Sequence, residues 1–407
     1  MTEPHGYGLH NLPFGIFSGP HDDRKRAAVA FENSIVDLDA LVADKLLDAE
    51  PLRGASTLND FLAAGLPAWR AVRARLQRLL GYGATADERA RVANATLPRD
   101  AVTLHLPVNV GDYVDFYSSI EHATNLGRIL RPNAEPLLPN YRHIPIGYHG
   151  RSGTVVVSGT PVRRPHGQQK AADASAPSFG PSKLLDVELE MGWIAGAPST
   201  HGEPVSADAV REHVFGYVLL NDWSARDIQA WEYQPLGPFL GKSFATSISP
   251  WIVTLDALEP FRTAEPARDP EPLPYLRARE NWAYDIELEM LLQTPRMRDR
   301  GEPPHRISRT NFRGMYWTAA QQLAHVTSNG ASIRPGDLFG TGTISGSEQG
   351  TQGSFIELTA RGADPLMLPS GETRAFLENG DTVIMRAQAV HGATRIAFGH
   401  VEGTIVA

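Results

Sequence analysis

The chain has 407 residues and contains no cysteine, so disulfides, thiolate metal ligands and cysteine nucleophiles are all excluded. It has no apolar run near the roughly 18 residues of a membrane span, and its N-terminus lacks the basic and apolar segments of a secretion signal. Basic residues are in the minority, and a net charge of -8 argues against a general nucleic-acid binder. These features predict a cytoplasmic protein that binds neither membrane nor nucleic acid.

Length and patterning predict two units, residues 1–107 and residues 108–407. In the first, short strands are expected at 28–31 and 34–37, and helices at 69–80 and 85–96. The second is mainly β, with one helix over 315–327. Its expected strands are 154–158, 185–194, 213–220, 251–254, 282–292, 355–359 and 381–387.

The segment 115–125 is the most informative, because it gathers Asp115, Tyr117 and His122 within a few residues. Ser118 followed by Glu121 is a capping-box pattern, which predicts a helix start between the acid and the imidazole. A metal-binding acid and a base would then face one pocket. A polar helix start whose histidine bonds locally explains the same residues equally well.

An acidic strand is expected over 185–191, where apolar and acidic residues alternate. Glu188 and Glu190 would project from one face, about 7 Å apart along the strand. Since two such carboxylates repel, a divalent cation between them is one solution, and a solvent-facing acidic strand is the other. Without cysteine, an oxygen-rich site favours Mg²⁺ or Ca²⁺. Residues 285–290 repeat the pattern, and periodicity alone does not choose between the two.

A strand over 213–220 is followed by a predicted helix over 222–233. Four polar residues at spacings of four, three and four would share one face of that helix. A pocket wall is favoured over a salt-bridged surface helix, because tryptophans and an isoleucine indicate partial burial. The four residues are Asp222, Arg226, Gln229 and Tyr233.

Three further polar segments have weaker signals. Lys242 ends a loop rich in turn formers, where it could stabilise an oxyanion or be an ordinary surface lysine. Residues 340–346 offer glycines and hydroxyls, and Glu357 is expected on the following strand. Residues 147–151 are another polar loop, which could belong to a site or be an ordinary surface loop. The chain has neither a phosphate-binding loop nor a Gly-x-Ser-x-Gly nucleophile elbow.

Taken together, these motifs resemble the fumarylacetoacetate hydrolase family over nearly the whole chain, from residues 11–15 to the end. The resemblance implies an SH3-like barrel over residues 1–107 and a C-terminal β-sandwich roll over residues 108–407 that carries the site, in a homodimer. Its most specific segments are Gly111-Asp-Tyr-Val-Asp-Phe-Tyr-Ser-Ser119, His122-Ala-Thr-Asn125, Leu138-Pro-Asn140, Gly147-Tyr-His-Gly-Arg151, Asn221-Asp-Trp-Ser-Ala-Arg-Asp-Ile-Gln229 and Pro235-Leu-Gly-Pro-Phe239.

The resemblance also implies roles for individual residues. The Mg²⁺ or Ca²⁺ ligands are Asp115, Glu188, Glu190 and Asp222, with Lys242 and Thr246 beside the metal. His122 matches a general base and Glu357 the carboxylate that orients it. The residues that match groups stabilising developing charge are Arg226, Gln229 and Lys242. Those that match substrate contacts are Tyr117, Arg131, Tyr148, Gln229, Tyr233 and Thr343.

The implied reaction is hydrolysis of 4-fumarylacetoacetate to fumarate and acetoacetate, the last step of tyrosine and phenylalanine catabolism. Acylpyruvate hydrolysis, dienoate isomerisation and oxaloacetate decarboxylation are rival chemistries of the same metal platform. A dimeric binding protein with a structural metal is a non-catalytic rival. The chain departs from the family pattern at Ile120-Glu121 and in the loop 347–353, which affects the rim of the site.

Overall fold

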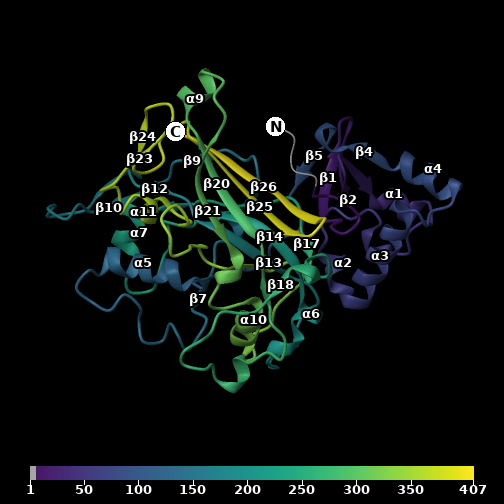
Figure 1. The fold of residues 1–407 in the computed structure, drawn as a ribbon, viewed down its shortest axis with the longest axis horizontal. Coiled ribbons are helices and arrows are strands. Elements are labelled where there is room, and N and C mark those ends of the chain that lie inside the picture. Colours follow the sequence, from purple (N-terminus) through teal and green to yellow (C-terminus); the bar gives the residue numbers. More distant parts are fainter. Residues whose placement is uncertain (1–5) are drawn as a thin grey trace.

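The computed structural model describes residues 6–407, and two units are distinct in it (Figure 1). The N-terminal unit is a five-stranded sheet of order β4-β3-β2-β1-β5 with helices packed beside it. Its strands are β1 Phe14–Gly19, β2 Asp22–Phe31, β3 Ser34–Asp37, β4 Thr96–Pro98 and β5 Thr103–His105. Its helices are α1 Leu38–Ala43, α2 Asn59–Ala63, α3 Gly65–Leu80 and α4 Ala86–Asn94.

The C-terminal unit is built on an eight-stranded sheet of order β7-β6-β22-β13-β14-β16-β8, with β17 paired to β14. It mixes antiparallel pairs with two parallel ones, β22 with β6 and β16 with β8. Its strands are β6 Tyr113–Phe116, β7 Gly147–His149, β8 Val155–Val157, β13 Leu189–Ala195, β14 Val214–Asp222, β16 Thr246–Ile248, β17 Val253–Thr254 and β22 Leu338–Gly340.

A second, five-stranded sheet of order β21-β20-β25-β26-β9 crosses the first, and its long yellow hairpin runs across the front of Figure 1. Apolar residues of both sheets share one hydrophobic cluster. The strands of the second sheet are β9 Val162–Arg163, β20 Glu287–Gln293, β21 His305–Asn311, β25 Thr382–His391 and β26 Thr394–Val406. The predicted fold class, mainly β with a small N-terminal unit and a larger C-terminal roll, is confirmed.

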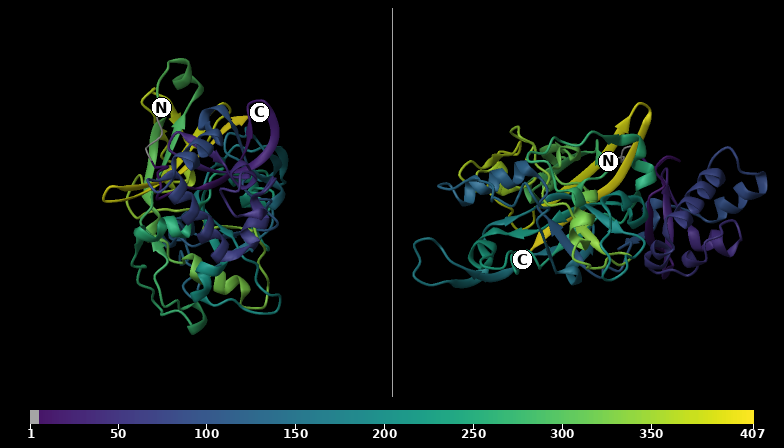
Figure 2. Two further views of the ribbon diagram at one scale, coloured as in Figure 1. Left: turned by 90° about the vertical axis from the view of Figure 1, so that its right-hand side faces the viewer. Right: turned by 90° about the horizontal axis from the view of Figure 1, so that it is seen from below.

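Short strand pairs and helices complete the roll. The two-stranded pairs are β10 His166–Gln169 with β11 Ser178–Pro181, β12 Leu185–Asp186 with β15 Ser224–Ala225, β18 Arg262–Thr263 with β19 Ala283–Tyr284, and β23 Leu366–Met367 with β24 Thr373–Arg374. The helices are α5 Ile120–Leu130, α6 Val210–His213, α7 Arg226–Glu232, α8 Leu255–Leu258, α9 Pro295–Asp299, α10 Ala319–Thr327 and α11 Phe355–Leu358. The β10–β11 hairpin projects from the roll, away from the N-terminal unit (Figure 2).

The N-terminal unit packs on the first sheet of the roll through one continuous hydrophobic cluster. Phe215 at the start of β14 lies edge-on to Phe14, Phe61 and Trp69, with ring centroids 5.5, 5.9 and 5.2 Å away. Phe14 also forms a backbone bridge with Ile252. The boundary at 107 and 108 stays a prediction, and apolar contacts cross it.

Candidate functional site

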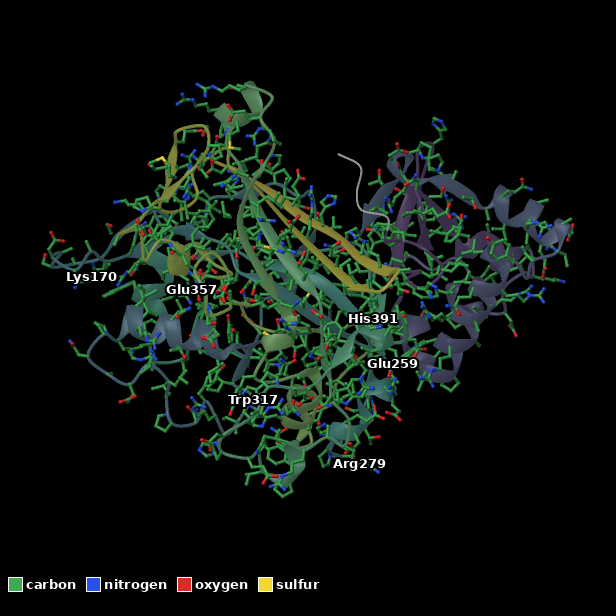
Figure 3. The ribbon with its side chains drawn as sticks, viewed as in Figure 1. Lys170, Glu259, Arg279, Trp317, Glu357 and His391 are labelled. Carbon is green, nitrogen blue, oxygen red and sulfur yellow. The ribbon has the colours of Figure 1, made fainter. Side chains whose placement is uncertain are left out.

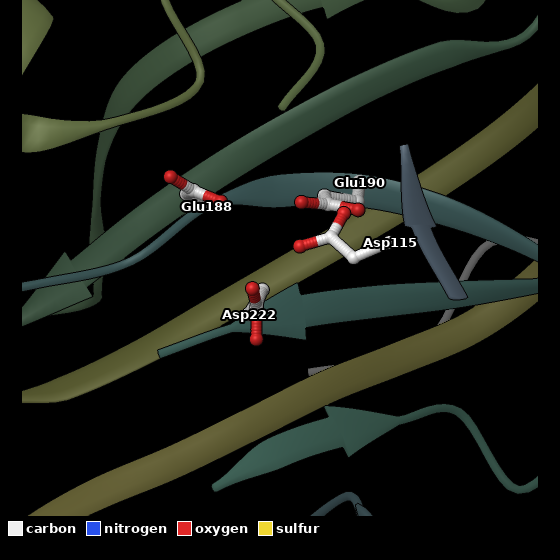
Figure 4. A group of neighbouring side chains, drawn as sticks. All are labelled: Asp115, Glu188, Glu190 and Asp222. Atoms are coloured by element: carbon white, nitrogen blue, oxygen red, sulfur yellow. The ribbon is translucent and has the colours of Figure 1, made fainter. Parts of the chain in front are cut away.

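Four buried carboxylates converge at the ends of neighbouring strands in the first sheet (Figure 4). Asp115 lies on β6, Glu190 on β13 and Asp222 at the end of β14, while Glu188 immediately precedes β13. Each offers an oxygen within 4.8 Å of the others. They meet because β13 pairs with β14 and both are linked through β22 to β6. A solvent-facing acidic strand is therefore not what residues 185–191 form.

Two of these carboxylates are held ionised by buried cations. Lys242 donates to Glu188 and, at 2.8 Å, to Asp222. Arg226 lies 2.8 Å from Glu188 on the other side, and Arg151 donates to both oxygens of Asp222. Burial alone would raise the pKa of each acid, but the neighbouring cations outweigh it and lower both pKa values.

The other two carboxylates have a different environment. Burial raises the pKa of Asp115 to about 7 and that of Glu190 well above its usual value. One oxygen of each is paired: Asp115 Oδ2 accepts from Arg151 and, at 2.9 Å, from Tyr148, and Glu190 Oε2 accepts from the Gly342 amide at 3.0 Å. Asp115 Oδ1 and Glu190 Oε1 are buried with no hydrogen-bond partner among the described residues. Unpaired buried oxygens in an all-carboxylate set fit a hard cation, so this cluster can bind a metal ion.

His122 and Glu357 form a second buried group. His122 Nδ1 lies 2.7 Å from Glu357 Oε2, and the two side chains are 2% and 1% exposed. With the Nδ1 proton donated to the carboxylate, Nε2 keeps its lone pair and can accept a proton. The ring of Tyr117 lies edge-on to the imidazole at 5.4 Å between centroids.

Glu357 is fixed by three neutral donors that sequence reasoning missed. Asn125 donates to one oxygen at 3.0 Å, and Ser345 and Ser354 donate to the other at 3.0 and 2.6 Å. Burial would raise the pKa of Glu357, but His122 and the hydrogen bonds together lower it. Asn125 and Ser345 lie in segments that were singled out as motifs, whereas Ser354 had no signal in the sequence.

The predicted helix start at Ser118 is one residue too early. Ser119 is the N-cap of α5, and its hydroxyl accepts from the His122 amide. Ser118 is used in tertiary contacts instead: its hydroxyl accepts from Gln322 of α10, and its carbonyl from the Tyr316 amide. Helix α10 itself begins at Ala319, later than the predicted start at residue 315.

Glu357 lies on a helix, which corrects the predicted strand over 355–359. Helix α11 begins there because the Asp186 carboxylate accepts from the Phe355 and Ile356 amides at 2.7 and 3.0 Å. The same carboxylate pairs with Arg226 at 2.8 Å. Asp186 was seen only as part of the alternating strand, yet it links α11 to α7.

The predicted helix over 222–233 is also wrong at its start. Strand β14 continues to Asp222, because that residue still pairs with Thr246 of β16, and α7 begins only at Arg226. The Thr246 hydroxyl donates to Asp222 at 2.9 Å. Asp222 and Arg226 nevertheless both lie beside Glu188. The tertiary fold brings them together, and not a shared helix face.

The remaining expected residues vary in their distance from the cluster. Gln229 accepts a hydrogen bond from Arg226 at 3.1 Å. Both residues, together with Tyr233, line a cavity of ≈ 70 Å³. Arg226 Nη2 and the Thr343 hydroxyl are buried without a hydrogen-bond partner among the residues described. Arg131 is the C-cap residue of α5, and its side chain donates to the Pro136 carbonyl at 2.8 Å rather than to the carboxylates.

The look-alike acids of 285–290 are in a different place. Glu287 and Glu289 lie on β20 of the second sheet and are partly exposed. Glu287 pairs with Arg309, and Glu289 lies 3.6 Å from Arg386. Figure 3 draws the side chains on the ribbon and labels Glu357, which lies to the left of the yellow β25–β26 hairpin. Strand pairing, rather than alternation, separates the two acidic pairs.

Comparison with known proteins agrees with this geometry. The family described as Fumarylacetoacetate (FAA) hydrolase C-terminal matches residues 113–406, and the family described as Fumarylacetoacetase N-terminal matches residues 10–107. The chain belongs to the fumarylacetoacetase family. It is 45% identical to the fumarylacetoacetase of Homo sapiens over 412 residues, covering 100% of this chain and 97% of that protein. The fumarylacetoacetase of Arabidopsis thaliana is 46% identical over 411 residues, covering 98% and 96%.

Solved structures support the fumarylacetoacetase-type fold. The fumarylacetoacetate hydrolase of psychrophilic Exiguobacterium antarcticum matches with a TM-score of 0.55 at 18% identity, covering 97% of this chain and 99% of that chain. A maleylpyruvate hydrolase from Sphingobium sp. SYK-6 matches with a TM-score of 0.52 at 15% identity over 97% and 99%. Within residues 6–407, no helix is long and apolar enough to span a bilayer.

Proposed function

We propose that this chain hydrolyses the carbon–carbon bond of 4-fumarylacetoacetate to give fumarate and acetoacetate, closing tyrosine and phenylalanine catabolism. The observation that carries the proposal is a four-carboxylate cluster beside a buried His122–Glu357 pair, in a chain that matches fumarylacetoacetases along its length. The reaction needs both parts, because water is a weak nucleophile and the leaving group is a carbanion.

We propose Mg²⁺ or Ca²⁺ as the cation, bound by Asp115, Glu188, Glu190 and Asp222. The oxygen-only ligand set and the two unpaired buried oxygens support this choice. Lys242 and Thr246 both donate to Asp222 and would hold this ligand carboxylate in place. When bound, the cation would supply Lewis-acid stabilisation of negative charge on the leaving group.

His122 is the proposed general base. Its Nδ1–H faces Glu357, so Nε2 is free to take a proton from the attacking water. Glu357 then stabilises the imidazolium that forms, because an ionised carboxylate at 2.7 Å favours the charged ring. Proton transfer of this kind contributes roughly 10²- to 10⁴-fold to the rate.

Developing charge on the attacked carbonyl would be stabilised by Arg226, Gln229 and Lys242. Arg226 Nη2 is the best placed of their donors, since it is buried and has no partner among the described residues. The residues proposed to bind the polar and anionic ends of the substrate are Tyr117, Arg131, Tyr148, Gln229, Tyr233 and Thr343. Arginine suits such a carboxylate, because its guanidinium donates two parallel hydrogen bonds.

The experiment follows loss of 4-fumarylacetoacetate absorbance after treatment with a chelator and re-addition of Mg²⁺ or Ca²⁺. We expect activity to vanish with chelator and return with either cation. Glu190→Gln should abolish turnover, whereas Glu289→Gln, the matched change in the look-alike strand, should leave it near wild type. Normal turnover in chelator, or equal effects of the two substitutions, would contradict the proposal.

The same assay separates the rivals. Turnover of an acylpyruvate, a dienoate or oxaloacetate in preference to 4-fumarylacetoacetate would assign another reaction of the metal platform. Metal binding without turnover of any of them would indicate a binding protein with a structural metal. The buried His122–Glu357 pair argues against that reading, because a structural metal needs no base.

We also propose a homodimer and a division into units at residues 107 and 108. The family resemblance supports the dimer, and the two family matches end and begin at residues 107 and 113. Sedimentation of the purified chain tests the dimer: a monomer at micromolar concentration would refute it. The cytoplasmic location stays a prediction from the sequence.

A further inference from the structure

Arg151 is a buried cation of the carboxylate cluster to which sequence reasoning assigned no role. Its side chain is 5% exposed. Nη1 donates to both oxygens of Asp222 at 2.6 and 2.8 Å, and Nη2 donates to Asp115 Oδ2 and, at 2.9 Å, to the Tyr148 hydroxyl. The guanidinium lies over the ring of Tyr113, 4.7 Å from its centroid. One side chain thus joins two carboxylates of the cluster to a proposed substrate contact.

The contacts of Asp222 leave no acceptor position free. Each carboxylate oxygen has two lone-pair positions. Arg151 occupies one position on each oxygen, Thr246 the second on Oδ1 and Lys242 the second on Oδ2. A divalent cation that draws on Asp222 therefore shares it with, or displaces, one of these donors. Of these donors, Lys242 also contacts Glu188, and the Arg151 guanidinium also contacts Asp115, which keeps one oxygen without a hydrogen-bond partner among the described residues.

The formal charges of the cluster are informative. Five carboxylates are buried here, because Asp186 adjoins the four of the metal cluster. Three cations pair with them directly, namely Arg151, Arg226 and Lys242. With every group ionised the sum is -2, which one divalent cation neutralises. Loss of the Arg151 charge would leave -3 in the same buried volume.

The backbone holds Arg151 firmly in this place. Its φ is 61°, in the left-handed region that residues other than glycine seldom adopt. Such a conformation persists where the surroundings determine it. The Arg151 carbonyl accepts from the Thr154 amide and hydroxyl, and the same hydroxyl donates to the Ser243 carbonyl beside Lys242. The two cations that flank Asp222 are thereby linked through one short turn.

We propose that Arg151 is a positioning residue that ties Tyr148 to Asp115 and Asp222, and that its charge limits how tightly the site binds a divalent cation. The inference rests on the proposed function only in taking the cluster as the metal site. Arg151 is a fixed positive charge beside the cation, so it opposes binding. Its removal leaves Asp115 held by Tyr148, and Asp222 held by Lys242 and Thr246.

The test is calorimetric titration of chelator-treated, full-length protein with MgCl₂ or CaCl₂. Because a unit charge a few ångströms away acts strongly even at an effective dielectric near 20, Arg151→Gln should tighten cation binding by on the order of tenfold or more. Its kcat should fall, since Tyr148 and the two acids lose their common donor. Arg151→Lys keeps the charge and should bind the cation within about threefold of wild type, with reduced kcat.

Arg309→Gln is the matched control, since Arg309 pairs with Glu287 on the other sheet, and its titration should equal that of wild type. Weaker or unchanged cation binding by Arg151→Gln would overturn the proposal, because a purely structural residue gives that result. Should Arg151→Gln fail to fold, Arg151→Met takes its place, and tenfold weaker binding by Arg151→Lys also refutes the charge argument. Wild-type protein that binds the cation but has no hydrolase activity refutes the proposed function and leaves this inference intact.

Discussion

At the scale of single residues, the site is decided by which buried oxygens have partners. A carboxylate removed from water is destabilising unless a hydrogen bond, a cation or a proton compensates. Glu188, Asp222 and one oxygen of Asp115 pair with cations, whereas the other oxygen of Asp115 and one oxygen of Glu190 have no partner among the described residues. A divalent cation would stabilise the ionised form of these buried acids, so the stabilisation that it gives should depend on pH.

We predict that added cation stabilises the protein more at high pH than at low pH. Burial raises the pKa of Asp115 to about 7, above the usual value, so its protonated form is favoured in the fold. Its contribution to stability is therefore present at low pH and lost as pH rises through about 7. The increase in unfolding temperature on adding Mg²⁺ or Ca²⁺ should be larger near pH 8 than near pH 6, measured by differential scanning fluorimetry. Asp115→Asn should remove most of the difference; an equal increase at both pH values in the wild type would refute the argument.

A second prediction concerns the hydroxyl that fixes Glu357. Ser354→Ala removes a donor at 2.6 Å that lowers the pKa of Glu357, so that pKa should rise. The acid limb of the kcat/KM profile reports proton uptake by the coupled His122–Glu357 pair, so a less stabilised carboxylate should move that limb up. Since one hydrogen bond contributes about 1 kcal/mol, the expected movement is about half a unit to one unit. Ser370→Ala, which removes a serine bond to Glu372 outside the site, is the control and should leave the profile in place. An unmoved acid limb in Ser354→Ala would show that the hydroxyl does not control this ionisation.

At the scale of elements, Asp186 connects the two helices that carry Glu357 and Arg226, which we propose take part in catalysis. It accepts the first amides of α11, which bears Glu357, and pairs with Arg226 at the start of α7. A four-residue helix has little stability of its own, so its position depends on such an acceptor. The sequence pattern does not reveal this, because the acceptor and the helix are 169 residues apart.

We predict that Asp186→Asn lowers the free energy of unfolding by about 3–5 kcal/mol, because it leaves Arg226 buried with a weakened partner and α11 with fewer acceptors. Chemical denaturation monitored by tryptophan fluorescence measures this loss. Asp256→Asn, which breaks the largely exposed pair with Arg70, should cost no more than about 1 kcal/mol. Similar losses in both variants would contradict the role given to Asp186.

At the scale of the whole molecule, the two units share a core. The cluster around Phe215 contains residues of β1, α2 and α3 together with β14, β16 and β22. The first sheet, which carries the carboxylates, therefore has one face covered by the N-terminal unit. This contact explains physically how a segment without site residues supports the site.

Phe215→Ala should lower the free energy of unfolding by about 3–5 kcal/mol and leave a single transition, because three aromatic contacts across the junction are lost. Phe179→Ala, at a residue 75% exposed on the β10–β11 hairpin, should change it by less than about 0.5 kcal/mol. Scanning calorimetry of both variants distinguishes cooperative unfolding of the two units from independent unfolding. If the units unfolded independently, Phe215→Ala would split the transition in two.

Several features could be predicted from the sequence because they are local. The strands at 28–31 and 34–37 and the helix at 69–80 follow from periodicity, and the resemblance identified the residues that meet at the cluster. The errors fell where a distant partner decides. Ser118 is bound by Gln322, β14 extends to Asp222 through β16, and α11 forms where Asp186 accepts its amides.

The sequence by itself determined the mainly β class, the exclusion of thiolate metal ligands, and which acids belong to the family motifs. Only the tertiary structure decided which of two nearly identical acidic strands is buried, because strand pairing places 188 and 190 beside β14 and, through β22, near β6, and leaves 287 and 289 on the second sheet. It also decided the cations: Arg151 reaches Asp222 across 71 residues of sequence. Charge balance in a buried cluster depends on distances in space, and no local pattern encodes them.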